Sequence, residues 1–317
     1  MAVAASARRP SLASAFLTIS RWEFMPGGVF FIFASAALAT LSWSALSDRL
    51  SVVAWGACVW YLSHLVGSQV NCLADVEIDE REKAHLSRAV RRFGPPRIVA
   101  LLVAESLAAI AVTVYMAVDT GRAALPFLWV AGLAIALAYS LEPVRLKRRG
   151  WLNPIALMLV LYALPMAYGY VALAERASAE AIAAICAIGL QMLALILLNA
   201  AADVRSDRLA GVETPCVRHG LAPVAAVAAL AYAAGAAVAI ACFAALAEGQ
   251  GAPNVAGLAV AAAGQLYVLQ EIVRLAALTR RGEGLESPAV VHLVKRNPVH
   301  FAVLGVSLAA ASALVLQ

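Results

Sequence analysis

The chain has 317 residues, of which 63% are hydrophobic and 14% are charged, and its net charge at pH 7 is +5. Soluble domains typically contain about 45–50% apolar and about 25% charged residues, so this composition excludes a soluble cytosolic enzyme. Its mean hydropathy of +0.84 indicates a chain built from membrane spans of about 20 residues each. We therefore attribute the excess of basic residues to membrane topology rather than to nucleic-acid binding.

Residues 11–22 precede the first apolar run, and two interpretations are open for them: a short interfacial helix or a disordered tail. No clear small-residue cleavage site follows, so we expect the first apolar run to be a retained span rather than a signal peptide.

Nine runs of low charge are expected to be membrane-spanning helices. They are continuous in Ala, Leu and Val rather than alternating, which excludes a closed β-barrel. The predicted fold is all-α: a polytopic membrane protein with nine transmembrane helices bundled around a central cavity. The expected spans are 24–47, 50–74, 98–118, 123–141, 150–174, 181–202, 219–247, 249–270 and 297–317.

The basic residues orient these spans. With nine crossings, 21 of the 24 Lys and Arg residues lie on one side, and only Arg49, Arg122 and Arg176 lie on the other. The positive-inside bias then predicts a cytoplasmic N-terminus and an external C-terminus. Glu105 lies inside the third run, and we expect it to face the bundle, either paired or protonated.

The long polar connections are expected on the cytoplasmic side, where function should be sought. For the last of them, two interpretations stay open, a lid over the site and a solvated connection. The four connections are 75–97, 142–149, 203–218 and 271–296.

One polar pattern occurs twice. Asn71, Asp75 and Asp79 stand at i, i+4 and i+8, and the same spacing returns 128 residues later in a second triad, Asn199, Asp203 and Asp207. Residues at this spacing lie on one face of a helix, within a wedge of about 80°, and climb about 12 Å. All three side chains of a triad can therefore point into one cavity.

Each triad ends an even-numbered span, which predicts an internal duplication. We expect one domain over 1–317, with pseudo-repeats at about 24–141 and 150–270 of four helices each, and a ninth helix at 297–317. Both triads would then lie at the cytoplasmic membrane boundary.

Four carboxylates at the negative ends of two helices repel one another unless cations lie among them. Hard divalent cations such as Mg²⁺ suit oxygen ligands and also bind substrate phosphates. The alternative is that these aspartates are merely solvated residues at helix ends. Basic residues in neighbouring loops would suit a diphosphate beside the metal, although topology alone also places Lys and Arg there; the candidates are Lys83, Arg88, Arg145 and Lys147.

Three segments together resemble the UbiA superfamily of intramembrane prenyltransferases, including chlorophyll-synthase-like members. Residues 71–79 (NCLADVEID) resemble its NDxxDxxxD motif, and residues 203–214 (DVRSDRLAGVET) match DxxxDxxxGxxT. Residues 139–151 (YSLEPVRLKRRGW) are similar to YSxxPxxLKxxGW. With the nine spans, the resemblance covers nearly the whole chain.

The resemblance implies that the motif aspartates, Asp75, Asp79, Asp203 and Asp207, carry catalysis and bind Mg²⁺ on a polyprenyl diphosphate. Asn71 joins them as a metal ligand by motif position, and Asn199 by the internal repeat. Arg88 and Lys147, with Arg145 and Lys83 nearby, are then expected to bind the diphosphate.

In such enzymes an allylic diphosphate ionises, and the isoprenoid chain passes to an aromatic or other lipophilic acceptor. Metal and basic side chains stabilise the leaving group, and an apolar cavity excludes water. Aromatic faces can stabilise the carbocation, although packing or a place in the membrane-interface belt is the more common role for any one of them; the candidates are Tyr61, Tyr139, Trp151, Tyr162 and Tyr168.

The chain departs from the motif at Cys72, where many relatives have Asp, and Ala200 stands at the matching place of the second triad. An acid that could bind a further metal or take an acceptor proton is therefore missing. This keeps a second hypothesis open, a terpene synthase that ionises the same substrate without an acceptor. A cation or phosphate transporter is a third possibility, but the acids stand at span ends rather than at mid-membrane.

The expected partners are a polyprenyl diphosphate, a lipophilic acceptor and membrane lipid, with no nucleic acid and no obligate protein partner. The alanine-rich composition suggests a bacterial plasma (inner) membrane, with an organellar inner membrane as the alternative. His64, seven residues before Asn71, is expected to be a core histidine rather than a ligand.

Overall fold

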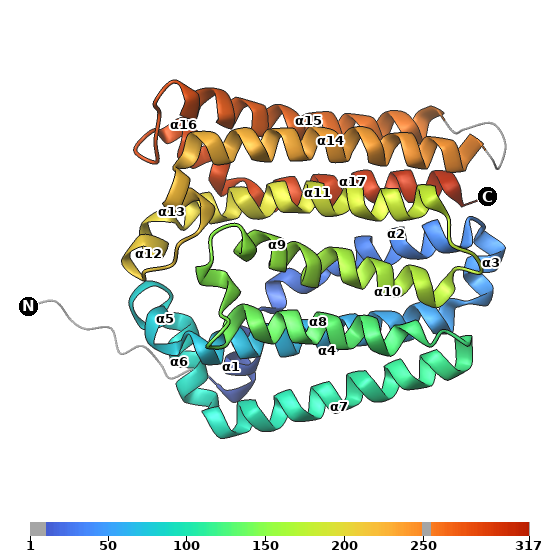
Figure 1. Cartoon of the computed structure of the whole chain (residues 1–317), viewed down its shortest axis with the longest axis horizontal. Helices are drawn as coiled ribbons and strands as arrows, with labels where there is room; N and C mark the ends of the chain where they lie inside the picture. The colour runs from blue at the N-terminus through green and yellow to red at the C-terminus, as the bar shows by residue number, and fades with distance from the viewer. Residues whose placement is uncertain (1–10, 249–254, 317) are drawn as a thin grey trace, which may run out of the picture.

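The computed structural model describes residues 11–248 and 255–316, and nearly all of them are helical. Long helices lie side by side in one bundle, with short helices at its ends (Figure 1). This confirms the predicted all-α membrane fold. The first half comprises α1 (Leu12–Ile19), the 3₁₀ turn η1 (Trp22–Gly27), α2 (Gly28–Thr40), α3 (Trp43–Asp48), α4 (Leu50–Ala74), α5 (Val76–Glu82), α6 (Ala84–Phe93), α7 (Pro95–Thr120) and α8 (Ala124–Ser140).

The second half begins with a short 3₁₀ turn, η2, which follows α8 directly. Its elements are η2 (Leu146–Arg148), α9 (Leu152–Met158), the π-helical turn η3 (Leu159–Ala163), α10 (Leu164–Leu173), α11 (Ala179–Ala202), α12 (Val204–Leu209), α13 (Pro215–His219), α14 (Leu221–Glu248), α15 (Val255–Arg280), α16 (Pro288–Lys295) and α17 (Asn297–Val315).

Within the described residues, eight helical segments are long and apolar enough to cross a membrane, and α8 is a shorter apolar helix of 17 residues. The span count of nine is therefore not confirmed, although each predicted span matches an apolar helical segment. The first span is shorter than expected: α2 ends at Thr40, where Leu41 adopts a left-handed conformation with φ 54°, and α3 is separate. The predicted span 249–270 begins outside the described residues, and its helix continues to Arg280.

Sequence signals account for several helix boundaries. Two prolines open α7 directly after Gly94, and Gly121, with φ 70°, closes it. Proline is favoured in the first turn of a helix, where its missing N–H costs nothing, and glycine is favoured just beyond a helix end. Pro165 stands in the middle of the fifth predicted span, and the π-helical turn η3 lies directly before it, where a regular α-helix would be disturbed.

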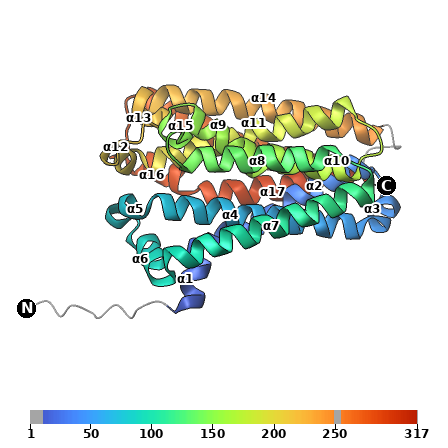
Figure 2. The ribbon, with the colours of Figure 1, turned by 60° about the horizontal axis from the view of Figure 1, so that its bottom comes forward.

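The polar connections gather at one end of the bundle. Figures 1 and 2 both show α5, α6, α12, α13 and α16 at the same end, whereas α3 and the end of α17 lie at the opposite end. The predicted common side of the four connections is thus confirmed. We call this the polar end; which membrane face it occupies remains a prediction.

A small apolar cluster joins α1 and α6 to the end of α4 that carries the first triad. Its buried members are Ala15, Ile19, Cys72, Leu86, Ala89, Val90 and Ile98. Residues 12–19 are therefore a packed helix rather than a disordered tail, and its place at the membrane interface stays a prediction.

The connection between α15 and α17 is also packed. Val290, Leu293 and Val294 of α16 are buried, and Arg296 Nη1 lies 3.0 Å from Glu271 Oε2. These contacts hold α16 against α11, α15 and α17.

Candidate active site

The first triad lies where α4 passes into α5. The helix is interrupted at Asp75, yet the Asp75 N–H donates to Asn71 O at 3.0 Å and the Asp79 N–H donates to Asp75 O at 2.8 Å. These i to i−4 bonds preserve helical spacing through the break. The three side chains therefore stay on one face, as the sequence predicts.

The second triad follows the same plan with one difference. The Asp207 N–H donates to Asp203 O at 2.8 Å, but the Asp203 N–H bonds to Ala200 O at 3.3 Å, a tighter turn. The side chain of Asn199 is exposed, whereas Asn71 is half-buried. The repeat is thus close at the aspartates and looser at the asparagine.

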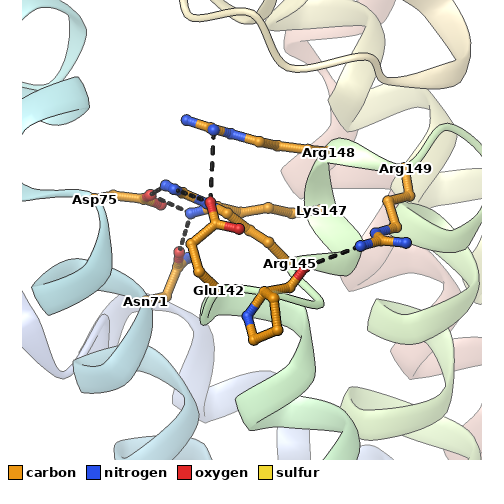
Figure 3. Close-up of polar contacts among 8 residues, drawn as sticks. Asn71, Asp75, Glu142, Arg145, Lys147, Arg148 and Arg149 are labelled. Atoms are coloured by element: carbon orange, nitrogen blue, oxygen red, sulfur yellow. Dashed lines mark hydrogen bonds and ion pairs between the residues drawn. The ribbon is translucent and has the colours of Figure 1, made fainter.

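Two basic side chains from the connection after α8 reach the first triad (Figure 3). Lys147 Nζ donates to Asp75 Oδ1 and lies 3.5 Å from Asn71 Oδ1. Arg145 Nη2 donates to the same Asp75 oxygen at 3.0 Å. Their side chains are largely buried, with exposed fractions of 7% for Lys147, 12% for Arg145 and 15% for Asp75.

Neighbouring groups shape the loop that carries these two residues. Glu142 Oε1 accepts from Arg145 Nη1 at 2.8 Å, and Arg149 Nη2 donates to Pro143 O at 2.9 Å. Asn153, in the first turn of α9, donates from Nδ2 to the backbone oxygen of Lys147 at 2.7 Å. The loop is therefore held from both sides of Lys147.

The same loop contacts the second motif. The Gly150 N–H donates to Glu213 O at 2.8 Å, and Gly150 has φ 54°, where an L side chain is disfavoured. A Cβ at this position would lie 3.4 Å from Arg218 Nη1. The glycine and the motif stretch 203–214 therefore meet in space.

Lys83 links the two triads. Its Nζ lies 3.5 Å from Asp203 Oδ2, and its charge also acts on Asp79 and Asp207. The side chains of Lys83 and Asp203 remain 41% and 37% exposed. The two acidic groups thus lie at one site with Lys83 between them.

Burial and like charge together perturb two carboxyls of the site. Burial, and then the neighbouring Asp75, raise the pKa of Asp79 to about 6. Burial, and then Asp203, raise the pKa of Asp207 to about 6. Burial lowers the pKa of Lys147, although Asp75 opposes this effect. Two partly buried carboxyls with raised pKa values are a favourable place for a further cation.

The donor set suits magnesium, although the protein ligands do not close around it by themselves. Among the described residues, no three His, Cys, Asp or Glu side chains converge closely enough to hold a metal ion. Mg²⁺ commonly takes one or two carboxylates and completes its shell with water and phosphate oxygens. The carboxyls therefore fit a metal that completes its shell with water or phosphate oxygens, and the buried cationic side chains beside them fit a phosphate ligand.

Most of the predicted basic residues belong to this site, but Arg88 does not reach it. Its side chain is exposed on α6. His64 is buried and stacks on Trp60 with centroids 5.6 Å apart, and its Nε2 lies 3.4 Å from Arg21 O. This arrangement favours the predicted core role for His64.

Three contributors were missed from the sequence. Glu142 and Asn153 hold the loop around Lys147, and the charge of Arg21, which stands between α1 and η1, acts on Asp79. Glu142 lies inside the third motif and Asn153 lies two residues beyond it, so closeness to the motif could have identified both as site residues. Arg21 gave no signal beyond its contribution to the basic N-terminal segment.

Residues 28–282 match the sequence model of the UbiA prenyltransferase family. Comparison with curated protein sequences found no match.

Solved structures of similar fold cover nearly the whole chain. A UbiA homologue from Aeropyrum pernix K1, in its apo form, has a TM-score of 0.61 at 19% identity and covers 94% of this chain and 98% of its own. A UbiA homologue from Archaeoglobus fulgidus, bound to GPP and Mg²⁺, has a TM-score of 0.62 at 15% identity and covers 95% and 99%. A digeranylgeranylglyceryl phosphate synthase structure has a TM-score of 0.61 at 10% identity and covers 95% and 98%. These likenesses show the shared fold.

Proposed function

The chain belongs to the UbiA prenyltransferase family, and on that premise we propose that it is a Mg²⁺-dependent intramembrane prenyltransferase. It ionises an allylic polyprenyl diphosphate and transfers the isoprenoid chain to an aromatic or other lipophilic acceptor. The observation that supports this most directly is the meeting of both aspartate triads with Lys83, Arg145 and Lys147 at the polar end of an apolar bundle.

Each residue has a role in this proposal. The carboxylates of Asp75, Asp79, Asp203 and Asp207 hold Mg²⁺, with Asn71 and Asn199 as the flanking oxygen donors. Lys147, Arg145 and Lys83 donate to the diphosphate oxygens and stabilise the negative charge that grows as the C–O bond breaks. Arg88 joins them only after its side chain turns from solvent. The bound Mg²⁺ supplies Lewis-acid stabilisation of the same leaving group.

The isoprenoid chain lies among apolar and aromatic side chains inside the bundle in this proposal. Tyr162, on the π-helical turn η3, lies between Phe31, with centroids 4.9 Å apart, and Phe301, at 6.3 Å. The charges of Asp75, Asp203 and Asp207 act on Tyr139, so Tyr139 lies at the end of the bundle where the diphosphate would bind. These aromatic faces suit an allylic cation, and the apolar surroundings protect the cation from water.

A terpene synthase is the second candidate, and Cys72 is the observation that favours it. Cys72 is buried in the apolar cluster and its Sγ lies 3.6 Å from Ile19 O. It neither faces the acidic group as a ligand nor replaces a proton-accepting carboxylate. Cyclisation or elimination needs no acceptor and is compatible with this substitution.

We further propose that the polar end faces the cytoplasm of a bacterial inner membrane. The concentration of basic residues in its connections supports this orientation. Polyprenyl diphosphate, being charged at one end, would then enter with its diphosphate at the cytoplasmic boundary.

The test is diphosphate release by the purified protein in nanodiscs from geranyl, farnesyl and geranylgeranyl diphosphates, with and without Mg²⁺. We expect Mg²⁺-dependent release in the wild type and its loss in an Asp75→Asn, Asp203→Asn double variant. The matched control is Asp48→Asn with Asp119→Asn, two exposed aspartates outside both motifs. Release that survives the first double variant would contradict the proposal.

The products separate the two candidates. A terpene hydrocarbon or alcohol formed from diphosphate alone indicates a synthase. Release and prenylated product that appear only after a lipophilic acceptor is added indicate transfer.

A further inference from the structure

Resting on the proposed function, we infer that the two aspartate triads accept metal in a fixed order. The second triad binds a divalent cation in the absence of a phosphate ligand. The first triad binds one only when a diphosphate is present, because the diphosphate becomes the new anionic partner of the Lys147 ammonium group. Lys147 and Arg145 serve as internal counter-ions of the first triad until that exchange occurs.

The first triad is occupied by cations of the chain itself. Lys147 and Arg145 both donate to Asp75 Oδ1, and Lys147 also approaches Asn71 Oδ1 at 3.5 Å. Two of the oxygens that this triad offers to a metal, Asp75 Oδ1 and Asn71 Oδ1, therefore face Lys147 (Figure 3). A metal ion bound to either of them must displace the ammonium group.

Displacing Lys147 is costly because the group is buried. Its side chain is 7% exposed and that of Asp75 is 15% exposed, so little water is available to receive the ammonium. The other carboxyl whose charge acts on Lys147, Asp79, belongs to the same triad, so a bound metal would occupy it as well. Removing one partner of a buried ion pair leaves an uncompensated charge, which is strongly unfavourable. A diphosphate beside the metal offers Lys147 a new anionic partner, and the cost is then offset.

Arg145 does not face the same penalty. Its Nη1 already donates to Glu142 Oε1 at 2.8 Å, and Glu142 is 61% exposed. When a metal binds Asp75 and displaces Arg145, Arg145 keeps Glu142 as its carboxylate partner. Lys147 is therefore the residue that couples metal to diphosphate at the first triad.

The second triad lacks such a barrier. Its contact with Lys83 is longer, 3.5 Å, and both Lys83 and Asp203 are more than a third exposed. Exposed ion pairs contribute little net stability, and a displaced Lys83 can be hydrated. A divalent cation can consequently replace Lys83 at Asp203 and Asp207 in the absence of any phosphate.

Mn²⁺ titration of the protein in nanodiscs, followed by electron paramagnetic resonance, measures this order. Without phosphate ligand, we expect tight binding of Mn²⁺ that Asp203→Asn abolishes and Asp75→Asn leaves intact. Methylenediphosphonate should then add binding that depends on Asp75. The same titration of the Asp75→Asn variant gives the background from Mn²⁺ that binds to free methylenediphosphonate in solution.

Removal of the internal counter-ion gives the sharper test. In Lys147→Met, Mn²⁺ binding at the first triad should appear without phosphonate, with an affinity gain of about ten-fold, a size usual for coupling between sites. Lys147→Gln keeps a hydrogen-bond donor and serves if the Met variant folds poorly. Arg97→Gln removes an equal charge from the exposed first turn of α7, outside the site, and should change Mn²⁺ affinity little.

Binding at both triads in the wild type without phosphonate, or no affinity gain in either Lys147 variant, would overturn the ordered binding. If aspartate-dependent diphosphate release is still observed, the proposed function stands and only this inference fails. If the wild-type protein shows neither aspartate-dependent metal binding nor diphosphate release, the proposed function is overturned as well.

Discussion

Asn153 Nδ2 donates to the backbone oxygen of Lys147 at 2.7 Å, and both side chains are buried. This bond ties the loop after α8 to the first turn of α9 and fixes the position from which the Lys147 side chain reaches Asp75. Asn153 is therefore a positioning residue that acts through Lys147.

Asn153→Asp removes the donor while keeping the size of the side chain, so Lys147 O loses its partner. A buried hydrogen bond of this kind is worth about 1–3 kcal/mol when one partner is left unsatisfied. We expect KM for the prenyl diphosphate to rise by about ten-fold, since 1.4 kcal/mol corresponds to that factor, with a smaller change in kcat. Steady-state kinetics of diphosphate release would measure both.

Tyr232→Phe is the control for this prediction, because it removes a buried bond of similar length, Tyr232 Oη to Gln265 Oε1 at 2.9 Å. It should lower thermal stability without raising KM. An unchanged KM in Asn153→Asp would show that the bond does not position Lys147.

The metal-free protein should become less stable as the pH rises from about 4 to about 6. Asp79 and Asp207 have folded pKa values of about 6 against ordinary values of 3.8. In this interval the folded state holds more protons than the unfolded chain, and stability then falls with rising pH. Melting temperatures in EDTA at pH 4 and pH 6 would show the decrease.

An Asp79→Asn, Asp207→Asn variant should show a flatter dependence on pH, because neither amide titrates. The Asp48→Asn, Asp119→Asn control should keep the wild-type slope. A melting temperature that increases through this interval in the wild type would contradict the prediction.

Gln69 and Glu105 form a polar pair inside the membrane-spanning part of the bundle. Gln69 Nε2 donates to Glu105 Oε1 at 3.0 Å, and the two residues are 0% and 8% exposed. Gln69→Leu leaves Glu105 without this partner, and we expect a loss of about 1–3 kcal/mol in unfolding free energy. Adding Glu105→Leu should recover much of it, because two apolar side chains then meet between α4 and α7. Denaturation of both single variants and the double variant would give the coupling energy.

The close packing of α11 against α14 depends on Gly235. A Cβ at this position would lie 2.5 Å from the backbone oxygen of Ala187, which can move only with its helix. Gly235→Ala should therefore destabilise the bundle by about 1–3 kcal/mol, as overpacking does. Gly67→Ala in α4 is the matched control, because nothing lies within 4 Å of its added Cβ. Equal melting temperatures for the two variants would contradict the packing argument.

Much of the architecture was predictable because the membrane restricts the choice of structure. Backbone in lipid must satisfy its own hydrogen bonds, so long apolar runs become helices, and the basic residues placed four connections on one side. The match to the UbiA family confirms the resemblance drawn from the motifs. The break at Leu41 escaped prediction because neither glycine nor proline marks that position, where the chain turns with φ 54°.

The sequence by itself determined the helical class, the grouping of the polar connections and the spacing of the two aspartate triads. These features depend on local rules, namely apolar length, charge distribution and the 3.6-residue period. Only the tertiary structure decided which cation meets which carboxylate: Lys147 and Arg145 at Asp75, Lys83 at Asp203, and Arg88 turned to solvent. Pairings of this kind join residues as much as 120 positions apart, so they depend on how whole helices pack rather than on any local pattern.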